Sequence, residues 1–140
     1  RPHSLLTLTG GALGQGMPCS VGAAFACPDR TVISFNGDGA AMYTLQSLWM
    51  QARDNLNITT LICANRSYDI LKLEYHRAGN TKPAQNTAAM MSLDNPSIDW
   101  VKMSEGMGVP AESVTSAAQL AQALKTAMAS SGPHLIEMVM

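Results

Sequence analysis

Asn36-Gly37-Asp38-Gly39-Ala40-Ala41 is the stretch that indicates most about the fold and the binding site of this chain. It follows the run Thr31-Val32-Ile33-Ser34-Phe35, which we expect to be a buried strand because it is short, apolar and β-branched. Glycines on both sides of Asp38 let main-chain N–H groups approach a ligand closely, and a following helix would aim its first N–H groups at an anion. These features favour a cation held against a phosphate.

A second stretch, Ala64-Asn65-Arg66-Ser67-Tyr68, ends another apolar run at residues 58–64. A helix-like run separates the two expected strands, so a βαβ unit would bring Asp38 and Asn65 to the carboxyl ends of neighbouring parallel strands. The carboxylate of Asp38, the amide oxygen of Asn65 and a main-chain carbonyl at Ser67 are hard donors that suit Mg²⁺. The tripeptide Gly-Asp-Gly alone would more often be a tight turn, and the paired asparagine makes that reading the weaker one.

Together the two stretches resemble the thiamine diphosphate (ThDP) signature of the acetolactate synthase, benzoylformate decarboxylase and pyruvate decarboxylase superfamily. In that signature Gly-Asp-Gly is separated from Asn by a segment like residues 40–64 here. Most members have Asn-Asn where this chain has Ala64-Asn65, and the metal ligand is the second Asn, which Asn65 keeps. The resemblance implies a three-layer α/β/α fold with a mainly parallel sheet. Residues 1–140 would form one ThDP- and Mg²⁺-binding domain, as part of a longer enzyme.

A glycine-rich loop, Gly10-Gly11-Ala12-Leu13-Gly14-Gln15-Gly16, precedes the first expected helix. Four glycines in seven residues prevent regular structure and permit close approach to a ligand. The resemblance implies that Leu13 wedges between the two rings of ThDP and that the Gly11 carbonyl accepts a hydrogen bond from the cofactor's 4′-amino group. The alternative is that Leu13 is an ordinary core leucine.

The resemblance also implies the remaining site residues. A short helix expected after Asn65 would line the substrate pocket with Leu71 and Glu74. Benzoylformate decarboxylases carry an aromatic residue where this chain has Glu74, which disfavours an aryl substrate. The predicted cofactor-binding set is Gly11, Ala12, Leu13, Gly37, Asp38, Gly39, Ala40, Ala41, Tyr43, Asn65, Ser67, Tyr68 and Asp69.

Elsewhere the pattern predicts further elements. Thr44 would cap a helix that turns Trp49 toward the core and Gln51 outward. Polar residues 78–95 indicate a long loop. The expected elements that follow are a helix within 96–108, a strand region at 109–114, a helix after Ser116 and a final buried strand at 134–139.

Composition limits the class of protein. The 140 residues are 46% hydrophobic and 14% charged, which fits one domain with a substantial core. A net charge of −1 without a basic run argues against nucleic acid and membrane surfaces as partners. No apolar stretch approaches the ~18 residues of a membrane span, so we expect a cytoplasmic protein. Cys19, Cys27 and Cys63 are odd in number and lie in apolar surroundings, which predicts buried thiols.

The resemblance implies non-oxidative decarboxylation or carboligation of 2-oxo acids, as in acetolactate synthase. Two alternatives stay open: a benzoylformate-type decarboxylase, and a non-catalytic metal-phosphate binding or assembly module. No catalytic residue is assigned within this chain. The activating glutamate is expected from a pyrimidine-binding domain of the same or a partner subunit, because none of the glutamates here lies in a segment resembling that domain. We therefore expect this domain to be inactive alone, and a homodimer or homotetramer when complete.

Overall fold

The structure is a computed structural model that describes residues 2–140. Within this range four strands form one sheet. Their order across the sheet is β1 (Val32–Gly37), β2 (Ile58–Ala64), β4 (His134–Val139) and β3 (Ala111–Val114). Each neighbouring pair is parallel. The α/β class with a mainly parallel sheet, expected from the sequence, is confirmed.

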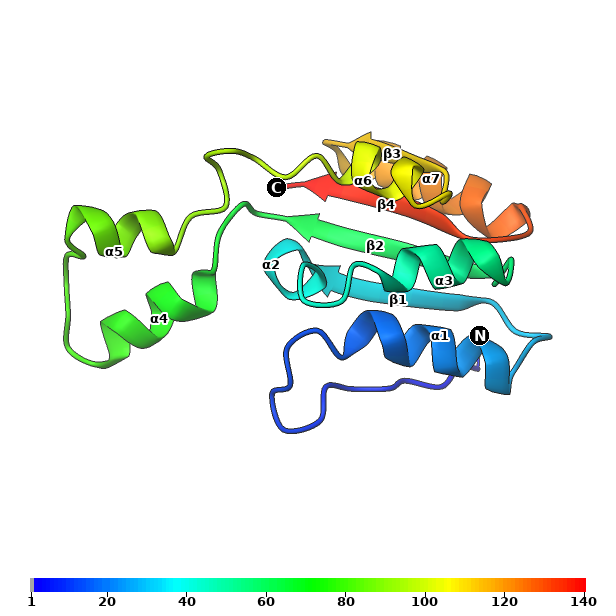
Figure 1. The fold of residues 1–140 in the computed structure, drawn as a ribbon, viewed down its shortest axis with the longest axis horizontal. Helices are drawn as coiled ribbons and strands as arrows, with labels where there is room; N and C mark the ends of the chain where they lie inside the picture. The colour runs from blue at the N-terminus through cyan, green and yellow to red at the C-terminus, as the bar shows by residue number, and fades with distance from the viewer. Residues whose placement is uncertain (1) are drawn as a thin grey trace.

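Helices cover both faces of this sheet. Three helices, α1, α3 and α6, lie in front of it, and α7 lies behind it, which gives the expected three layers (Figure 1). No helix in residues 2–140 has the length and apolarity needed to cross a membrane. The helices of this range are α1 (Gly16–Ala26), α2 (Asp38–Ala41), α3 (Ser47–Arg53), α4 (Asp69–Arg77), α5 (Gln85–Met90), α6 (Trp100–Gly106) and α7 (Ala117–Ala129).

Hydrophobic clusters pack on both faces of the sheet. In front, Leu48 and Trp100 pack with Ile62 of β2. Behind, Ala123 and Ala127 of α7 pack with Leu61, Val114 and Ile136 of the sheet. Ser116 caps α7 as predicted, since its Oγ accepts a hydrogen bond from the Gln119 amide at 3.3 Å. Strands β2 and β4 are thus packed on both faces, and the loops that follow them project from a well-packed edge.

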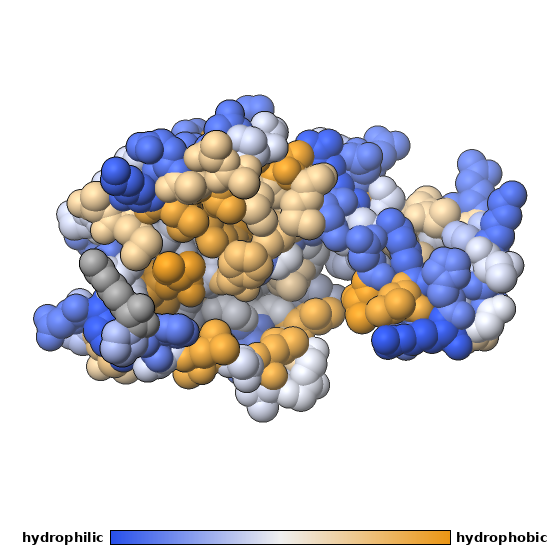
Figure 2. Space-filling model, turned by 180° about the vertical axis from the view of Figure 1, so that it is seen from behind, coloured by the Kyte–Doolittle hydropathy of each residue, from blue (hydrophilic) through white to orange (hydrophobic). Residues whose placement is uncertain are grey.

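Strand β1 is buried on one face only, which corrects the expectation of a fully buried strand. Ile33 and Phe35 point to the back and keep 49% and 67% of their surface exposed. The physical reason is that β1 lies at the edge of the sheet, while α7 packs on the other three strands. Apolar residues accordingly gather over the back of the molecule, with a further apolar area at the base of the projecting helices (Figure 2).

Helices α4 and α5 form an arm that projects away from the sheet (Figure 1). Neither helix contains a buried residue. The arm is closed at its base by two main-chain hydrogen bonds, Tyr68 N to the Met91 carbonyl at 2.9 Å and Leu93 N to the Arg66 carbonyl at 2.8 Å. The polar segment 78–95 is therefore not only a loop, because it contains α5.

Helix α3 is turned differently from the prediction. Trp49 is 55% exposed and lies against the Arg53 guanidinium, which is 5.1 Å from the ring centroid. Gln51, expected outside, is fully buried, and its Oε1 accepts a hydrogen bond from the Thr60 hydroxyl at 3.3 Å. Both predictions were wrong because the core face of this seven-residue helix is built from Leu48 and its i+3 neighbour Gln51.

Two smaller expectations also fail. Thr44 does not cap α3, whose N-cap is Gln46 without a side-chain hydrogen bond. Cys27 is exposed, and Cys19 and Cys63 are half-buried, so the three thiols are not all in the core.

Candidate functional site

The carboxyl ends of β1 and β2 bring the two predicted stretches together. Gly37 pairs with Cys63 at the ends of the strands, so Asp38 and Asn65 lie just beyond the same edge. A pocket of about 230 Å³ opens there. Nine of the predicted cofactor-binding residues line it: Leu13, Gly37, Asp38, Gly39, Ala40, Asn65, Ser67, Tyr68 and Asp69.

Asp38 is held rigidly at the bottom of this edge. Only 3% of the residue is exposed, and both carboxylate oxygens accept main-chain hydrogen bonds. Its Oδ1 accepts from Gly39 N at 2.8 Å, and its Oδ2 accepts from Arg66 N at 2.7 Å. Arg66 adopts a left-handed conformation (φ 54°) in the turn that carries this N–H. The carboxylate therefore joins the two strand ends across the site.

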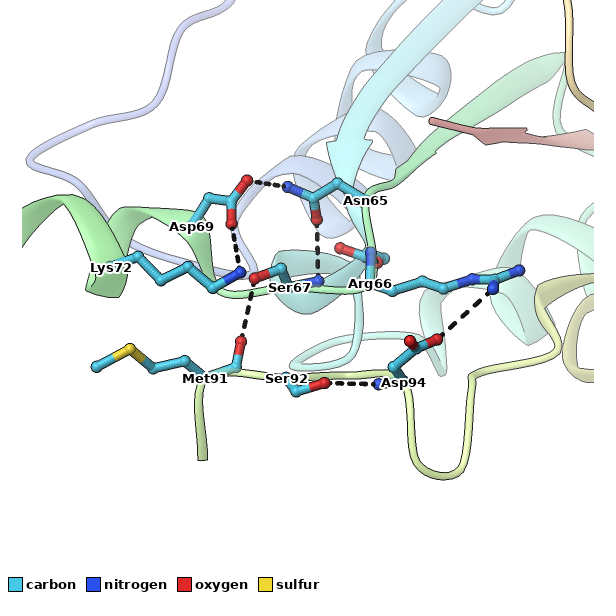
Figure 3. Close-up of polar contacts among 9 residues, drawn as sticks. Asn65, Arg66, Ser67, Asp69, Lys72, Met91, Ser92 and Asp94 are labelled. Carbon is cyan, nitrogen blue, oxygen red and sulfur yellow. Dashed lines mark hydrogen bonds and ion pairs between the residues drawn. The ribbon is translucent and has the colours of Figure 1, made fainter. Parts of the chain in front are cut away.

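The loop after β2 forms a polar network (Figure 3). The Asn65 Oδ1 accepts a hydrogen bond from Ser67 N at 3.1 Å, and its Nδ2 donates to Asp69 Oδ2 at 3.0 Å. The Ser67 hydroxyl donates to the Met91 carbonyl at 3.1 Å, which ties the loop to the residue that follows α5 at the base of the arm. The Ser67 hydroxyl, Lys72 and Asn65 hold the pKa of Asp69 below its usual value, so this second carboxylate is ionised near neutral pH.

The donor set fits a hard divalent cation. Asp38 and Asn65 each present an oxygen that accepts one N–H here and keeps further lone pairs. Among the turns, loops and caps of residues 2–140, no main-chain N–H donates to the Ser67 carbonyl, which leaves this oxygen open to a cation. No three His, Cys, Asp or Glu side chains cluster in this range, so an ion here would draw on amide and carbonyl oxygens as well. This composition suits Mg²⁺.

Gly39 permits a close contact that shapes the pocket. A Cβ built on Gly39 would meet Tyr68 Cε1 at 2.5 Å and Tyr68 Cδ1 at 2.8 Å. The tyrosine ring therefore lies directly over the main chain that follows Asp38. Any larger residue at position 39 would have to displace this ring.

Leu13 lies between two cavities. It lines the pocket beside Asp38, and it also lines a second cavity of about 270 Å³ beneath the glycine-rich loop. Gly37 and Ala40 are shared by both cavities as well. Leu13 is 52% exposed, so it is not an ordinary core leucine. Leu13 thus lines both cavities, and its role as a wedge between two rings stays a prediction.

Six predicted residues do not line the pocket beside Asp38. Ala41 is buried in the front core cluster. Glu74 forms an ion pair with Arg77 at 2.6 Å on the exposed surface of α4. The other four are exposed outside this pocket: Gly11, Ala12, Tyr43 and Leu71.

Three lining residues were missed: Cys63, Ile70 and Met140. Burial, and then the charge of Asp38, raise the pKa of the Cys63 thiol. Met140 follows β4, and its N–H donates to the Ala64 carbonyl at 3.1 Å. Met140 could have been predicted from the sequence, because it follows the expected strand at 134–139 and parallel strands all end at the same edge of a sheet.

Comparison with known proteins agrees with this geometry. The family described as "Thiamine pyrophosphate enzyme, C-terminal TPP binding domain" matches residues 1–138. A protein of Mycobacterium tuberculosis named "Putative acetolactate synthase large subunit IlvX" is 50% identical over 138 residues, which are 98% of this chain and 27% of that protein. Benzoylformate decarboxylase of Pseudomonas aeruginosa is 35% identical over 136 residues, 97% of this chain and 24% of its own length.

Among solved structures, the thiamine diphosphate-dependent 4-hydroxybenzoylformate decarboxylase of Rhodococcus jostii RHA1 matches with a TM-score of 0.82 and 34% identity. The match covers 91% of this chain and 23% of that one. The chain thus spans about a quarter of the length of these relatives. Sequence motif, fold and family match agree, and the chain belongs to the C-terminal TPP-binding domain family of thiamine pyrophosphate enzymes.

Proposed function

We propose that residues 1–140 form the diphosphate- and Mg²⁺-binding domain of an enzyme that decarboxylates or ligates 2-oxo acids, as acetolactate synthase does. The observation that carries the proposal is the single pocket in which Asp38, Asn65 and Ser67 meet at the carboxyl ends of β1 and β2. The 50% identity to a protein named as an acetolactate synthase large subunit supports this choice of reaction class.

Each group in the pocket then has a role. The Asp38 carboxylate, the Asn65 amide oxygen and the Ser67 carbonyl would hold Mg²⁺, and the Mg²⁺ would neutralise a diphosphate. Ala40, which lines the pocket, would present its main-chain N–H to that anion, because the Gly39 N–H already donates to Asp38. Leu13 would separate the two rings of the cofactor. When bound, ThDP would supply a nucleophilic carbon for addition to the keto carbon and a cationic thiazolium ring to take up the electron pair left by CO₂.

Part of the site would come from elsewhere. We assign no catalytic acid to this chain: of its four glutamates, Glu74 is paired with Arg77, and none of the four lines the pocket beside Asp38. A pyrimidine-binding domain, in the same chain or in a partner subunit, would supply the activating glutamate, most simply within a homodimer or homotetramer. With pyruvate, ThDP and Mg²⁺, the 140-residue chain alone should release no CO₂, and sustained turnover would contradict this part of the proposal.

A benzoylformate-type decarboxylase is the second candidate. Two relatives with such names match at 35% and 34% identity. Glu74, which was expected to disfavour an aryl substrate, is paired with Arg77 on the exposed surface of α4. The complete enzyme, supplied in turn with pyruvate and with benzoylformate, distinguishes the two. Acetolactate from pyruvate supports the first candidate, and benzaldehyde from benzoylformate supports the second.

Binding calorimetry tests the cofactor assignment directly. The chain is titrated with ThDP, ADP and NAD, each with and without Mg²⁺. We expect ThDP to bind with Mg²⁺ and to bind more weakly without it, while ADP and NAD give little heat. Equal heats for the three ligands, or ThDP binding that ignores Mg²⁺, would count against the proposal.

A further inference from the structure

The side-chain amide of Asn65 is fixed at both ends. Its oxygen accepts a hydrogen bond from Ser67 N at 3.1 Å, and its nitrogen donates to Asp69 Oδ2 at 3.0 Å (Figure 3). An asparagine amide has almost the same shape when rotated by half a turn, but the rotation exchanges an acceptor for a donor. Only the oxygen can bind a cation. The orientation of this amide therefore decides whether Asn65 can serve as a ligand.

Asp69 selects one of these two orientations. Carboxylate oxygens accept hydrogen bonds, so Asp69 Oδ2 pairs with the amide nitrogen of Asn65 at 3.0 Å, whereas the amide oxygen would find no donor there. A charge-assisted hydrogen bond of this kind is roughly twice as strong as the neutral one from Ser67 N. Asp69 is thus the stronger of the two groups that orient Asn65.

We propose that Asp69 is a positioning residue that keeps the Asn65 amide oxygen turned toward the metal side of the pocket, away from Asp69 itself. The inference rests on the proposed Mg²⁺ site and adds to it a residue that does not itself bind the ion.

Asp69 is well placed for this role. It opens α4, where a carboxylate is favoured by the helix dipole, and Lys72 Nζ lies 3.1 Å from its Oδ1, one turn along the helix. Its other oxygen, Oδ2, is the one that faces Asn65. The side chain is 59% exposed, so substitutions there should leave the fold intact.

Two simpler roles have to be separated from positioning. One is an action on the ion through the negative charge of Asp69 alone, and the other is stabilisation of α4 through the pair with Lys72. Asp69→Ala removes both the charge and the acceptor. Asp69→Asn removes the charge but keeps a carbonyl oxygen that can accept from Asn65 Nδ2. Lys72→Ala removes the ion pair but leaves the Asp69–Asn65 contact in place.

The test measures Mn²⁺, which favours oxygen ligands as Mg²⁺ does, by electron paramagnetic resonance of the chain in the presence of ThDP. We expect Asp69→Ala to weaken Mn²⁺ binding by about tenfold, the lower end of the loss found when a group that orients a metal ligand is removed. Asp69→Asn and Lys72→Ala should stay within about twofold of the parent. Thermal unfolding of each variant checks that the fold is intact.

Other outcomes overturn the inference in distinguishable ways. Equal losses in Asp69→Ala and Asp69→Asn would show that charge, and not orientation, is what matters. Parent-like binding by Asp69→Ala would show that Ser67 N orients Asn65 sufficiently without Asp69. If the parent chain itself bound no Mn²⁺ with ThDP, the proposed metal site would fail, and the positioning role would fail with it.

Discussion

The Thr44 hydroxyl donates a 2.7 Å hydrogen bond to the main-chain carbonyl of Gly14, thirty residues earlier in the chain. Gly14 has a φ of 82°, and a Cβ built on it would meet Tyr43 Cβ at 2.7 Å. The glycine-rich loop is thus joined to the turn after α2 by one hydrogen bond and one close contact. This junction positions Leu13, which the loop carries, beside the main chain of the Asp38 stretch.

Thr44→Val should loosen this junction. The change keeps the side-chain volume but removes the donor, and we expect a loss of about 1 kcal/mol in unfolding free energy, the usual net value of one hydrogen bond. Hydrogen exchange of the amides in residues 10–16 should become faster. Thr44→Ser keeps the hydroxyl and is the control. If Thr44→Val exchanged like the parent, the bond would not be what holds the loop.

Asp38→Asn should abolish most of the metal dependence of ThDP binding, because it removes the formal charge among the proposed ligands. We expect Mg²⁺ affinity in the presence of ThDP to fall by at least ~10-fold in calorimetry. The new side-chain NH₂ group is a donor, and it must face the main-chain N–H of either Gly39 or Arg66, which is also a donor. One buried hydrogen bond is therefore lost, and the free energy of unfolding should fall by about 1–3 kcal/mol. Asp29→Asn, on the exposed turn after α1, is the matched control.

Gly39→Ala tests the contact with Tyr68. The new methyl group overlaps the tyrosine ring and should drive it from its place over the pocket. We expect ThDP to bind roughly tenfold more weakly, a cost of about 1.4 kcal/mol, when measured with Mg²⁺. Gly106→Ala is the control, since a Cβ there meets no atom within 4 Å. Equal ThDP affinity in both variants would mean that the ring does not shape the site.

Leu13→Ala should affect the geometry of the bound cofactor more than its affinity. Leu13 touches the space between the two cavities, whereas the ion and the diphosphate would be held at the Asp38 end. In the complete enzyme, exchange of the cofactor's C2 proton should slow, while ThDP affinity changes little. Leu5→Ala, in an exposed leucine outside both cavities, is the control. Unchanged exchange in Leu13→Ala would remove the wedge role.

The cap of α6 gives a pH-dependent contribution to stability. The Lys102 side chain, and then its amide, hold the pKa of Asp99 below its ordinary value of 3.8. Because this pKa is lower in the folded state than in the unfolded state, the ionised carboxylate stabilises the fold at pH values above the unfolded-state pKa. This stabilisation is lost as the pH falls through the folded-state pKa. Asp99→Ala should therefore melt below the parent at pH 7, and the two melting temperatures should converge in acid. A constant difference would contradict this linkage.

The sequence was most informative where chemistry and strand order coincide. Asp38 and Asn65 were predicted to meet because each follows an apolar run in a βαβ unit, and the parallel pairing of β1 and β2 places them at one edge. It was least informative about which face of an element is covered. Nothing in the run that contains Ile33 and Phe35 shows that α7 covers the other three strands and leaves these side chains exposed.

The polar core of α3 was equally hidden. Helical spacing alone favours Trp49 for the interior, yet the buried Gln51 bonds to Thr60 on β2, a contact made by a residue in another element. Helix α5 escaped prediction for a related reason: it has six residues and buries none, so it leaves no periodic apolar signal. Glu74 was assigned to a pocket by position along the helix, and its pairing with Arg77 was not foreseen.

The arm has a consequence for how such a protein can change over time. Asp69 and Ile70, at the start of α4, line the pocket, yet nothing in α4 or α5 is buried in the core. Substitutions along these helices can therefore accumulate without eroding the stability of the sheet. Substitutions in the arm should change the free energy of unfolding little, whereas the strand ends that carry Asp38 are constrained by the core on which they pack. Beyond Asp69 and Ile70, the arm can thus vary in sequence while the pocket at the strand ends stays as it is.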